Sequence, residues 1–451
     1  MYMVGIKKNI LLFTLLLLNT CLIILLGLIL PRNAVYFYAS FLGLVILFIG
    51  FLYWLLQILE VHKRKTIFLI LLVGLLFKII CLLTINSLVT FPDELGVYDN
   101  FSWRQTKSWL GEDDFRINSS DYTSSNQVYY YFLAIIYYLF GHSVIIAKLF
   151  NLFLSLLSGL LIFLLVQKIF EDIQISIISL VLVLFSLSLN IWTLVLLRES
   201  LMIFLLSLSF YSIVQLVYPI RVRYLIMLIV CMGLLVSVRS YITKVLFLAI
   251  VIHVLILILR KHKRFGYIFI TGMFFVTAII LFLFIFYSAD LINFKNVNAH
   301  RKIIATNGNS GFLQNVDISN FQKTISFLPQ GLAYFFFSPF IWDLSDYKRI
   351  ALIPDTIFWY IIWLFVFLGI IITVKNKRIW SVSYLITFCG LIIVLYSLID
   401  GNLGLLHRHR IQATYFLLIF GAVGLKYFAA FFKGILEKIK NKNYSIHNDA
   451  Y

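Results

Sequence analysis

Charged residues are scarce in this chain, and acidic residues are the rarer kind. Only 12% of its 451 residues are charged, and 19 of these are Asp or Glu, whereas a soluble domain carries about a quarter of its residues as charges. This shortage excludes a soluble globular enzyme, a disordered tail protein and a nucleic-acid-binding domain. The composition is 62% hydrophobic, which fits a polytopic membrane protein.

Several sequence signals are also absent. Each of the four cysteines lies inside an apolar run, so the sequence indicates neither a disulfide framework nor a thiolate metal site. No Walker A loop, glycine-rich nucleotide fingerprint or HExxH motif occurs. Cytoplasmic ATP is therefore not the expected energy source, and chemistry at the outer face needs an activated substrate that is already in the membrane.

Long apolar runs predict an all-α membrane bundle of about twelve transmembrane helices, with shorter re-entrant or interfacial helices beside them. The predicted spans are 9–30, 34–59, 66–90, 144–166, 174–194, 200–217, 224–238, 243–259, 266–288, 355–374, 379–397 and 411–432. We divide the chain into an N-terminal hairpin, a large transmembrane module, an outer loop and a C-terminal part. Their boundaries are 1–65, 66–288, 289–354 and 355–451.

The net charge of +18 orients these spans, because basic loops stay on the cytoplasmic side. Basic clusters place both termini in the cytoplasm of a multi-pass cytoplasmic-membrane protein, and the loops 91–126, 289–354 and 398–410 outside. The loop 289–331 is polar, rich in asparagine and spaced by glycines, so it is expected to be mobile. A full crossing by 127–140 would turn every later basic cluster outward. Either 127–140 is a half-helix or a later helix is broken, and both imply a cavity near the outer loop.

The first outer loop is rich in acids, with seven of the 19 in its 36 residues. Asp93 and Glu94 follow a proline at the outer end of a span, where partial desolvation can raise the basicity of a carboxylate toward that of a general base. The alternative is a solvated pair of helix-end acids. Residues 99–110 predict an amphipathic helix that lies in the membrane interface.

Other charged residues also lie where a membrane protein rarely has them. Arg198 and Glu199 lie between two predicted spans, either as a pair that closes the loop or with Glu199 as a second acid in the cavity. Lys78 and Lys148 lie deep in apolar runs, where charges pair or face a cavity. Arg239 lies in a predicted outer turn.

The strongest basic feature on the outer side is His407-Arg408-His409-Arg410. Outer arginines contradict the positive-inside trend, and a phosphate suits the guanidinium group. The alternative is an interfacial anchor. Histidines two residues apart point to different sides of a helix, so we do not favour a metal site formed by His407 and His409.

An ordered set of motifs resembles the N-terminal module of GT-C membrane glycosyltransferases, the family 39-type group of protein O-mannosyltransferases and aminoarabinose transferases. The set covers about residues 90–215 and consists of Asp93-Glu94, Tyr98, Tyr129-Tyr130-Tyr131, Leu139 to Ser143, Lys148 to Asn151 and Lys168-Ile169-Phe170. The second acid of that family is usually Asp and is Glu199 here. Two additional spans precede the usual first helix, and no soluble C-terminal domain follows.

The resemblance implies transfer of a sugar from a polyprenyl-phosphate donor to a glycan or lipid acceptor hydroxyl on the outer face, in surface-glycan assembly. It implies catalytic roles for Asp93, Glu94 and Glu199. The predicted lipid-phosphate ligands are Arg408, Arg410, Arg239 and Arg198. No cofactor is certain, and the need for a divalent metal stays open. The alternatives are an O-antigen or capsule-type polymerase or ligase, which would depend on Arg408 and Arg410, and a lipid or glycan transporter.

Overall fold

The computed structural model describes residues 34–59, 63–88, 94–112, 126–216, 221–261, 294–306, 310–340 and 353–448. Within these ranges every regular element is a helix. Eight of the described helices are long and apolar enough to cross a membrane, or up to nine if a bent pair counts as one span. The expected helical membrane architecture is confirmed at this level. The count of twelve stays a prediction, because the runs 9–30 and 266–288 lie outside the described residues.

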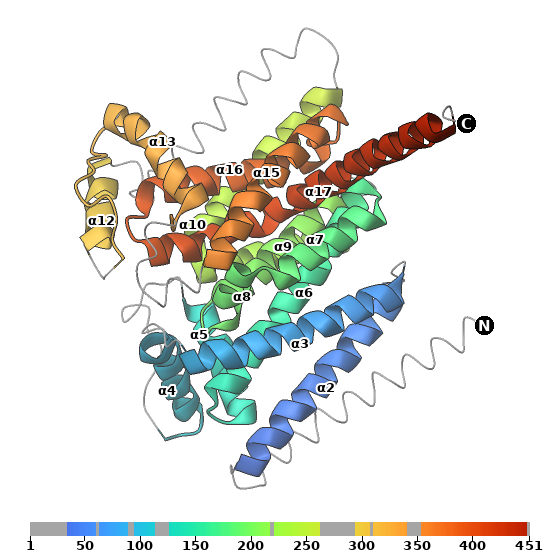
Figure 1. The fold of residues 1–451 in the computed structure, drawn as a ribbon. Coiled ribbons are helices and arrows are strands. Elements are labelled where there is room, and N and C mark those ends of the chain that lie inside the picture. Colours follow the sequence, from blue (N-terminus) through green and yellow to red (C-terminus); the bar gives the residue numbers. More distant parts are fainter. Residues whose placement is uncertain are drawn as a thin grey trace. The chain divides into compact units, whose positions relative to one another are not determined.

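The described chain separates into two compact units, whose helices are labelled in Figure 1. Unit 1 comprises Met1–Leu160, Leu189–Ser209 and Leu225–Ser240, and unit 2 comprises Leu161–Ser188, Phe210–Tyr224 and Tyr241–Tyr451.

Two pairs of packed helices form part of unit 1. The helices α2 (Ala34–Ile58) and α3 (Arg64–Leu88) pack together, and α4 (Asn100–Trp109) packs against α5 (Gln127–Phe140). The Thr106 hydroxyl on α4 donates to the carbonyl of Ala134 at 3.0 Å. The helix expected over 99–110 is therefore confirmed, and its place in the membrane interface stays a prediction.

The sequence offered two ways to keep the later basic clusters in the cytoplasm, a half-helix at 127–140 or a broken later helix. The structure contains a helix that corresponds to each. The helix α5 has 14 residues and spans about 21 Å at 1.5 Å per residue, against a hydrocarbon core of about 30 Å. Further along, α7 (Ile173–Phe185) and α8 (Leu187–Leu194) meet at a 58° bend. Ser186 at the bend has an extended backbone. The span expected at 174–194 is thus a broken one.

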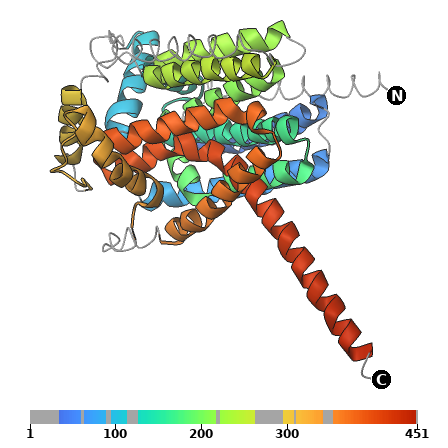
Figure 2. The same cartoon turned by 90° about the horizontal axis from the view of Figure 1, so that it is seen from above.

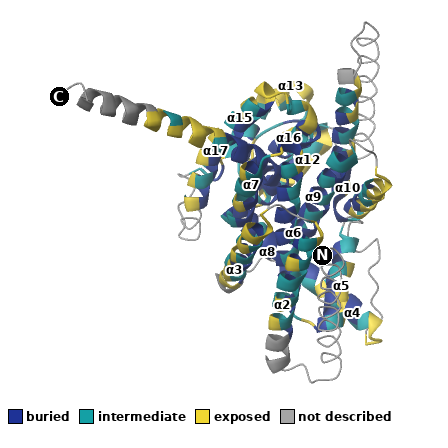
Figure 3. Ribbon diagram, turned by 90° about the vertical axis from the view of Figure 1, so that its right-hand side faces the viewer, coloured by how far each residue is buried: buried dark blue, intermediate teal, exposed yellow. Residues whose placement is uncertain are grey.

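In unit 2 the neighbours of α17 (Leu403–Asn448) are α7, α15 (Ile353–Lys375) and α16 (Ile379–Ile399). The first part of α17 is largely buried, as the dark blue ribbon shows (Figure 3). Its C-terminal part extends beyond the other helices of this unit (Figure 2).

Two sequence predictions need correction. The region 289–354, expected as a loop, contains α12 (Phe294–Thr306) and α13 (Phe321–Phe337). Its asparagines suggested turns, but Asn320 caps α13 by accepting from the Lys323 N–H at 2.9 Å.

The second correction concerns the loop expected at 398–410. It is short, because α17 begins at Leu403 and includes His407 to Arg410, and hydropathy alone could not locate that start. The segment α10 (Val222–Lys261) consists of two helices that meet at a kink, where Arg239 has non-helical backbone angles. The two spans expected at 224–238 and 243–259, with a turn at Arg239, agree with this break.

Candidate functional site

Glu94 is the first residue of a π-helical turn, η1 (Glu94–Asp99), and it is 1% exposed. Its carboxylate accepts the backbone N–H of Leu196 at 2.7 Å and lies 2.5 Å from the ammonium group of Lys148 on α6 (Val144–Phe170). Single π turns are rare and occur often at functional sites. Asp93, its predicted partner in catalysis, lies outside the described residues.

The segment between α8 and α9 (Glu199–Leu216) is held from two sides. Glu94 binds the N–H of Leu196, and the Asn151 amide donates to the carbonyl of Val195 at 2.8 Å and to the Tyr129 hydroxyl at 2.8 Å. Non-helical backbone inside a membrane protein needs such partners, because lipid offers none. The two side chains therefore fix the backbone that leads into Arg198 and Glu199.

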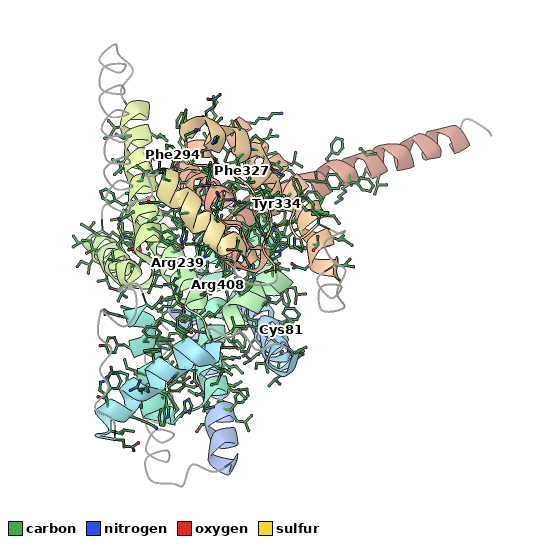
Figure 4. All side chains as sticks on the ribbon, turned by 90° about the vertical axis from the view of Figure 1, so that its left-hand side faces the viewer. Cys81, Arg239, Phe294, Phe327, Tyr334 and Arg408 are labelled. Carbon is green, nitrogen blue, oxygen red and sulfur yellow. The ribbon has the colours of Figure 1, made fainter. Side chains whose placement is uncertain are left out.

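Glu199 and Arg239 form a second buried ion pair in unit 1. Glu199 begins α9 with no exposed surface, and its carboxylate lies 3.6 Å from the guanidinium of Arg239, which is labelled in Figure 4. The neighbouring Arg198 donates to the carbonyl of Val238 at 2.8 Å and to the side-chain oxygen of Asn126. Arg198 therefore supplies a donor to a carbonyl at the kink of α10.

These contacts define an ionic cluster in unit 1. The two pairs are connected through the segment that precedes α9, because Glu94 binds the Leu196 N–H and Glu199 begins α9. The members of the cluster are Glu94, Lys148, Arg198, Glu199 and Arg239.

Lys78, the deep lysine of α3, has a different environment. It is 1% exposed and donates to the Ser155 hydroxyl at 3.0 Å and to the side-chain oxygen of Asn190. Both acceptors are neutral oxygens. The expected pairing with an opposite charge is therefore found for Lys148, whereas neutral groups hold Lys78.

Arg408 and Arg410, which were expected on the outer side, belong to unit 2. Arg410 is 3% exposed and donates to the carbonyls of Phe335 at 3.0 Å and Ser338 at 2.8 Å. These carbonyls close the C-terminus of α13, a position that basic side chains commonly occupy. Arg408, labelled in Figure 4, is 9% exposed.

Unit 2 also holds two buried carboxylates that sequence reasoning missed. Asp355, in the first turn of α15, accepts the backbone N–H and the hydroxyl of Ser188. Asp400, at the end of α16, lies 3.0 Å from Nδ1 of His409 through both of its oxygens. Both residues lie at or near the end of a predicted span, and this position is the sequence feature that could have identified them as candidates.

A polar cavity of about 230 Å³ lies elsewhere in unit 2, beside the basic turn between α15 and α16. Its lining includes Asp172, Asn376, Arg378 and Tyr427. The positive-inside trend predicts the cytoplasmic side for this turn, whereas the predicted site residues belong to loops expected on the outer side.

Over the parts of the chain that the structure describes, no group of three or more His, Cys, Asp or Glu side chains could hold a metal ion. Searches against family models, curated proteins and solved structures found no match. The chemistry must therefore be inferred from the residues themselves.

Proposed function

We propose that this protein is a membrane glycosyltransferase of GT-C type, which transfers a sugar from a polyprenyl-phosphate donor to an acceptor hydroxyl at the outer face. The observation that carries the proposal is the buried ionic cluster of unit 1. Ionisable residues inside membrane proteins are costly, and they usually mark a substrate or ion path.

The arginines of the cluster favour an anionic substrate, because arginine is well shaped to bind a phosphate. A lipid phosphate that leaves a sugar accumulates negative charge in the transition state. Preorganised cations stabilise that charge without reorganising.

Within this proposal the acidic residues have different roles. Glu94 is engaged with Lys148 and the Leu196 N–H, so we assign it to positioning. Glu199 holds Arg239 in place. The general-base role that the resemblance gives to Asp93 stays a prediction.

The alternative functions make different demands on the same residues. A transporter is expected to carry a proton or ion relay at mid-membrane, and the deep Lys78 donates to neutral oxygens rather than to a carboxylate. A polymerase would need Arg410 for its lipid phosphate, whereas Arg410 donates to two carbonyls of α13. The transferase therefore fits these contacts best.

The proposal is tested by the pool of lipid-linked sugars in cells whose sole copy of the gene carries Arg239→Ala or Glu199→Gln. Removal of one preorganised charge slows such reactions by roughly 10²–10³-fold, so a polyprenyl-phosphate monosaccharide should accumulate. Mass spectrometry of lipid extracts measures the pool, and blotting of membranes measures the protein.

The matched control is Lys323→Ala, which changes an exposed lysine of α13 and should leave the pool at the wild-type level. Arg239→Lys keeps the charge but loses the planar guanidinium, and an intermediate pool is expected. An unchanged pool in Arg239→Ala at normal protein level would contradict the proposal. Accumulation of single lipid-linked repeat units would indicate a polymerase instead.

A further inference from the structure

The polar cavity of about 230 Å³ in unit 2 has no role in the chemistry proposed above. Its lining comes from three places in that unit: the junction of α6 and α7, the end of α15 with the turn that follows it, and α17 (Figure 1). Drug-sized ligands occupy pockets of about 300–1,000 Å³, so this cavity suits a smaller group. Its polar side chains favour a polar occupant over an acyl chain.

The turn between α15 and α16 has a defined backbone. The N–H of Arg378 donates to the carbonyl of Thr373 at 3.1 Å, and the N–H of Lys377 donates to that of Val374 at 3.0 Å. Together with the positive φ of 55° at Lys377, these bonds form a Schellman motif, which closes the C-terminus of α15. The backbone that carries Arg378 is therefore fixed before any ligand binds.

Lysine is an unusual residue at the left-handed position of this motif. Glycine is common there because it has no Cβ atom, whereas other residues are disfavoured at positive φ. The turn reads Lys375-Asn376-Lys377-Arg378, and both of its lysines are exposed. Three basic residues thus occupy one four-residue turn, and one of them stands where stability alone would favour glycine. Such a concentration of positive charge attracts anions.

Arg378 is the basic residue of this turn that lines the cavity. Its Nη1 donates to the carbonyl of Ile169 near the C-terminus of α6, a position that basic side chains commonly occupy. Its donors on Nη2 and Nε have no hydrogen-bond partner among the described residues. A half-buried guanidinium that is held by one bond and keeps other donors is well suited to a phosphate.

Tyr427 on α17 supplies a second donor to the cavity. Its hydroxyl accepts a hydrogen bond from the side-chain nitrogen of Asn376 at 3.0 Å. A hydroxyl that accepts one bond still has its own hydrogen to donate, and no described residue accepts that hydrogen. Because Asn376 belongs to the turn and Tyr427 to α17, this bond also joins two walls of the cavity.

The acid in the lining, Asp172, already has its partners. One carboxylate oxygen accepts the N–H groups of Gln174 and Ile175 at 2.9 and 3.2 Å and caps α7. The other oxygen pairs with the ammonium group of Lys426 on α17. These contacts offset the negative charge of Asp172. Glu171, the neighbouring acid, is exposed and is not part of the lining.

We propose that this cavity binds a phosphate group, with the Arg378 guanidinium and the Tyr427 hydroxyl as donors to the phosphate oxygens. The positive-inside trend predicts the cytoplasmic side for the basic turn, and basic pockets between transmembrane helices on that side bind the headgroups of anionic lipids. An anionic phospholipid and a soluble phosphate share this chemistry. The site is formed within unit 2 and does not depend on the function proposed for unit 1.

The test is thermal unfolding of the purified full chain in a non-ionic detergent, with one ligand added at a time. The ligands are dioleoyl phosphatidylglycerol, dioleoylglycerol, which has the same chains without the phosphate, and inorganic phosphate at constant ionic strength. A ligand that binds only the folded protein raises its unfolding temperature as the ligand concentration rises. We expect this rise with at least one of the two phosphate-bearing ligands and none with dioleoylglycerol.

Two variants test the proposed donors. Arg378→Gln can still donate to the carbonyl of Ile169 but has no charge, and Tyr427→Phe loses only the hydroxyl. A lost hydrogen bond to a charged group weakens binding by roughly tenfold, so each variant should need about ten times more ligand for the same shift. The matched control is Lys433→Ala, which removes an exposed cation of α17 that is not part of the lining and should respond like the wild type.

The ligands also separate the two sources of the phosphate. A rise with phosphatidylglycerol alone identifies a lipid headgroup, and a rise with inorganic phosphate identifies a soluble phosphate. A rise with neither, or an equal rise with dioleoylglycerol, would overturn the proposal.

An unchanged ligand requirement in both Arg378→Gln and Tyr427→Phe would also overturn it, because the phosphate would then bind elsewhere. An equal loss in Lys433→Ala would overturn it as well, since general surface charge would suffice. If Arg378→Gln does not fold, Tyr427→Phe decides the test, because its ring remains and only the donor is removed.

Discussion

Glu94 and Lys148 illustrate, at the scale of single residues, what an ion pair costs inside a membrane protein. Their side chains keep 2% and 4% of their surface exposed, so water scarcely screens either charge. Removing one partner of a buried pair typically costs about 3–5 kcal/mol, whereas replacing both by apolar residues is often neutral. The pair is therefore sensitive to single changes and tolerant of double ones.

Glu94→Gln should lower the free energy of unfolding by about 3 kcal/mol, because the buried Lys148 would face a neutral amide in place of the carboxylate. Glu94→Leu combined with Lys148→Met should restore most of that loss. Thermal unfolding of the purified protein in detergent measures both.

The control is Asp317→Asn, which breaks an exposed pair. Hydrogen bonds from Lys323 and Ser319 lower the pKa of Asp317, but the side chains of Asp317 and Lys323 are 40% and 50% exposed, and water screens such pairs. No change is expected there. Equal losses of unfolding free energy in Glu94→Gln and Asp317→Asn would show that water screens the Glu94–Lys148 pair as well.

The sequence placed these charged residues but could not pair them. A buried charge needs a partner, so Lys148 and Glu199 could be singled out from their apolar surroundings. Arg198 and Glu199 are adjacent in sequence, yet Arg198 contacts Val238 and Glu199 contacts Arg239. Asp355 was missed because its partner Ser188 is 167 residues away, a separation no local pattern encodes.

At the scale of elements, α15 and α17 approach so closely that glycine is required. A Cβ atom on Gly369 would lie 1.8 Å from the carbonyl oxygen of Phe420, and one on Gly424 would lie 2.0 Å from that of Phe365. Small residues that let backbones approach are typical of membrane helix pairs.

Gly424→Ala should therefore destabilise the protein by roughly 1–3 kcal/mol through overpacking. Gly434→Ala on the same helix meets nothing within 4 Å, and alanine favours helix by up to about 1 kcal/mol. In detergent, the unfolding temperature of Gly424→Ala should fall. That of Gly434→Ala should rise or stay unchanged. A matching fall in both variants would contradict the close approach.

The helices themselves were predictable where apolar runs had clear ends, as for α15 and α16. They were not predictable where polar residues continue a helix. The first two turns of α17 contain His407 to Arg410 and are helical, because Asn402 accepts the N–H groups of Gly404 and Leu405 and starts the helix. The side chains through which α12 and α13 pack within unit 2 are widely spaced in the sequence, so no local hydrophobic pattern predicted these two helices.

At the scale of the whole molecule, composition already defined the class. Hydrophobic residues make up 62% of the chain, and no soluble architecture accommodates that share. The sides of the membrane follow from basic clusters and stay predictions. Each unit carries its own buried charged groups, and the proposed chemistry assigns the lipid phosphate to the cluster of unit 1.

The most direct test of this account is the fate of the donor in membranes from cells that lack the protein, since these supply both donor and acceptor. Purified wild-type protein is added in detergent-destabilised vesicles, and mass spectrometry follows the lipids, with Glu199→Gln as the inactive control. We predict that polyprenyl-phosphate monosaccharide falls while polyprenyl phosphate rises by the same amount. An unchanged donor pool, or growth of lipid-linked oligosaccharides without any fall in the monosaccharide, would contradict the account.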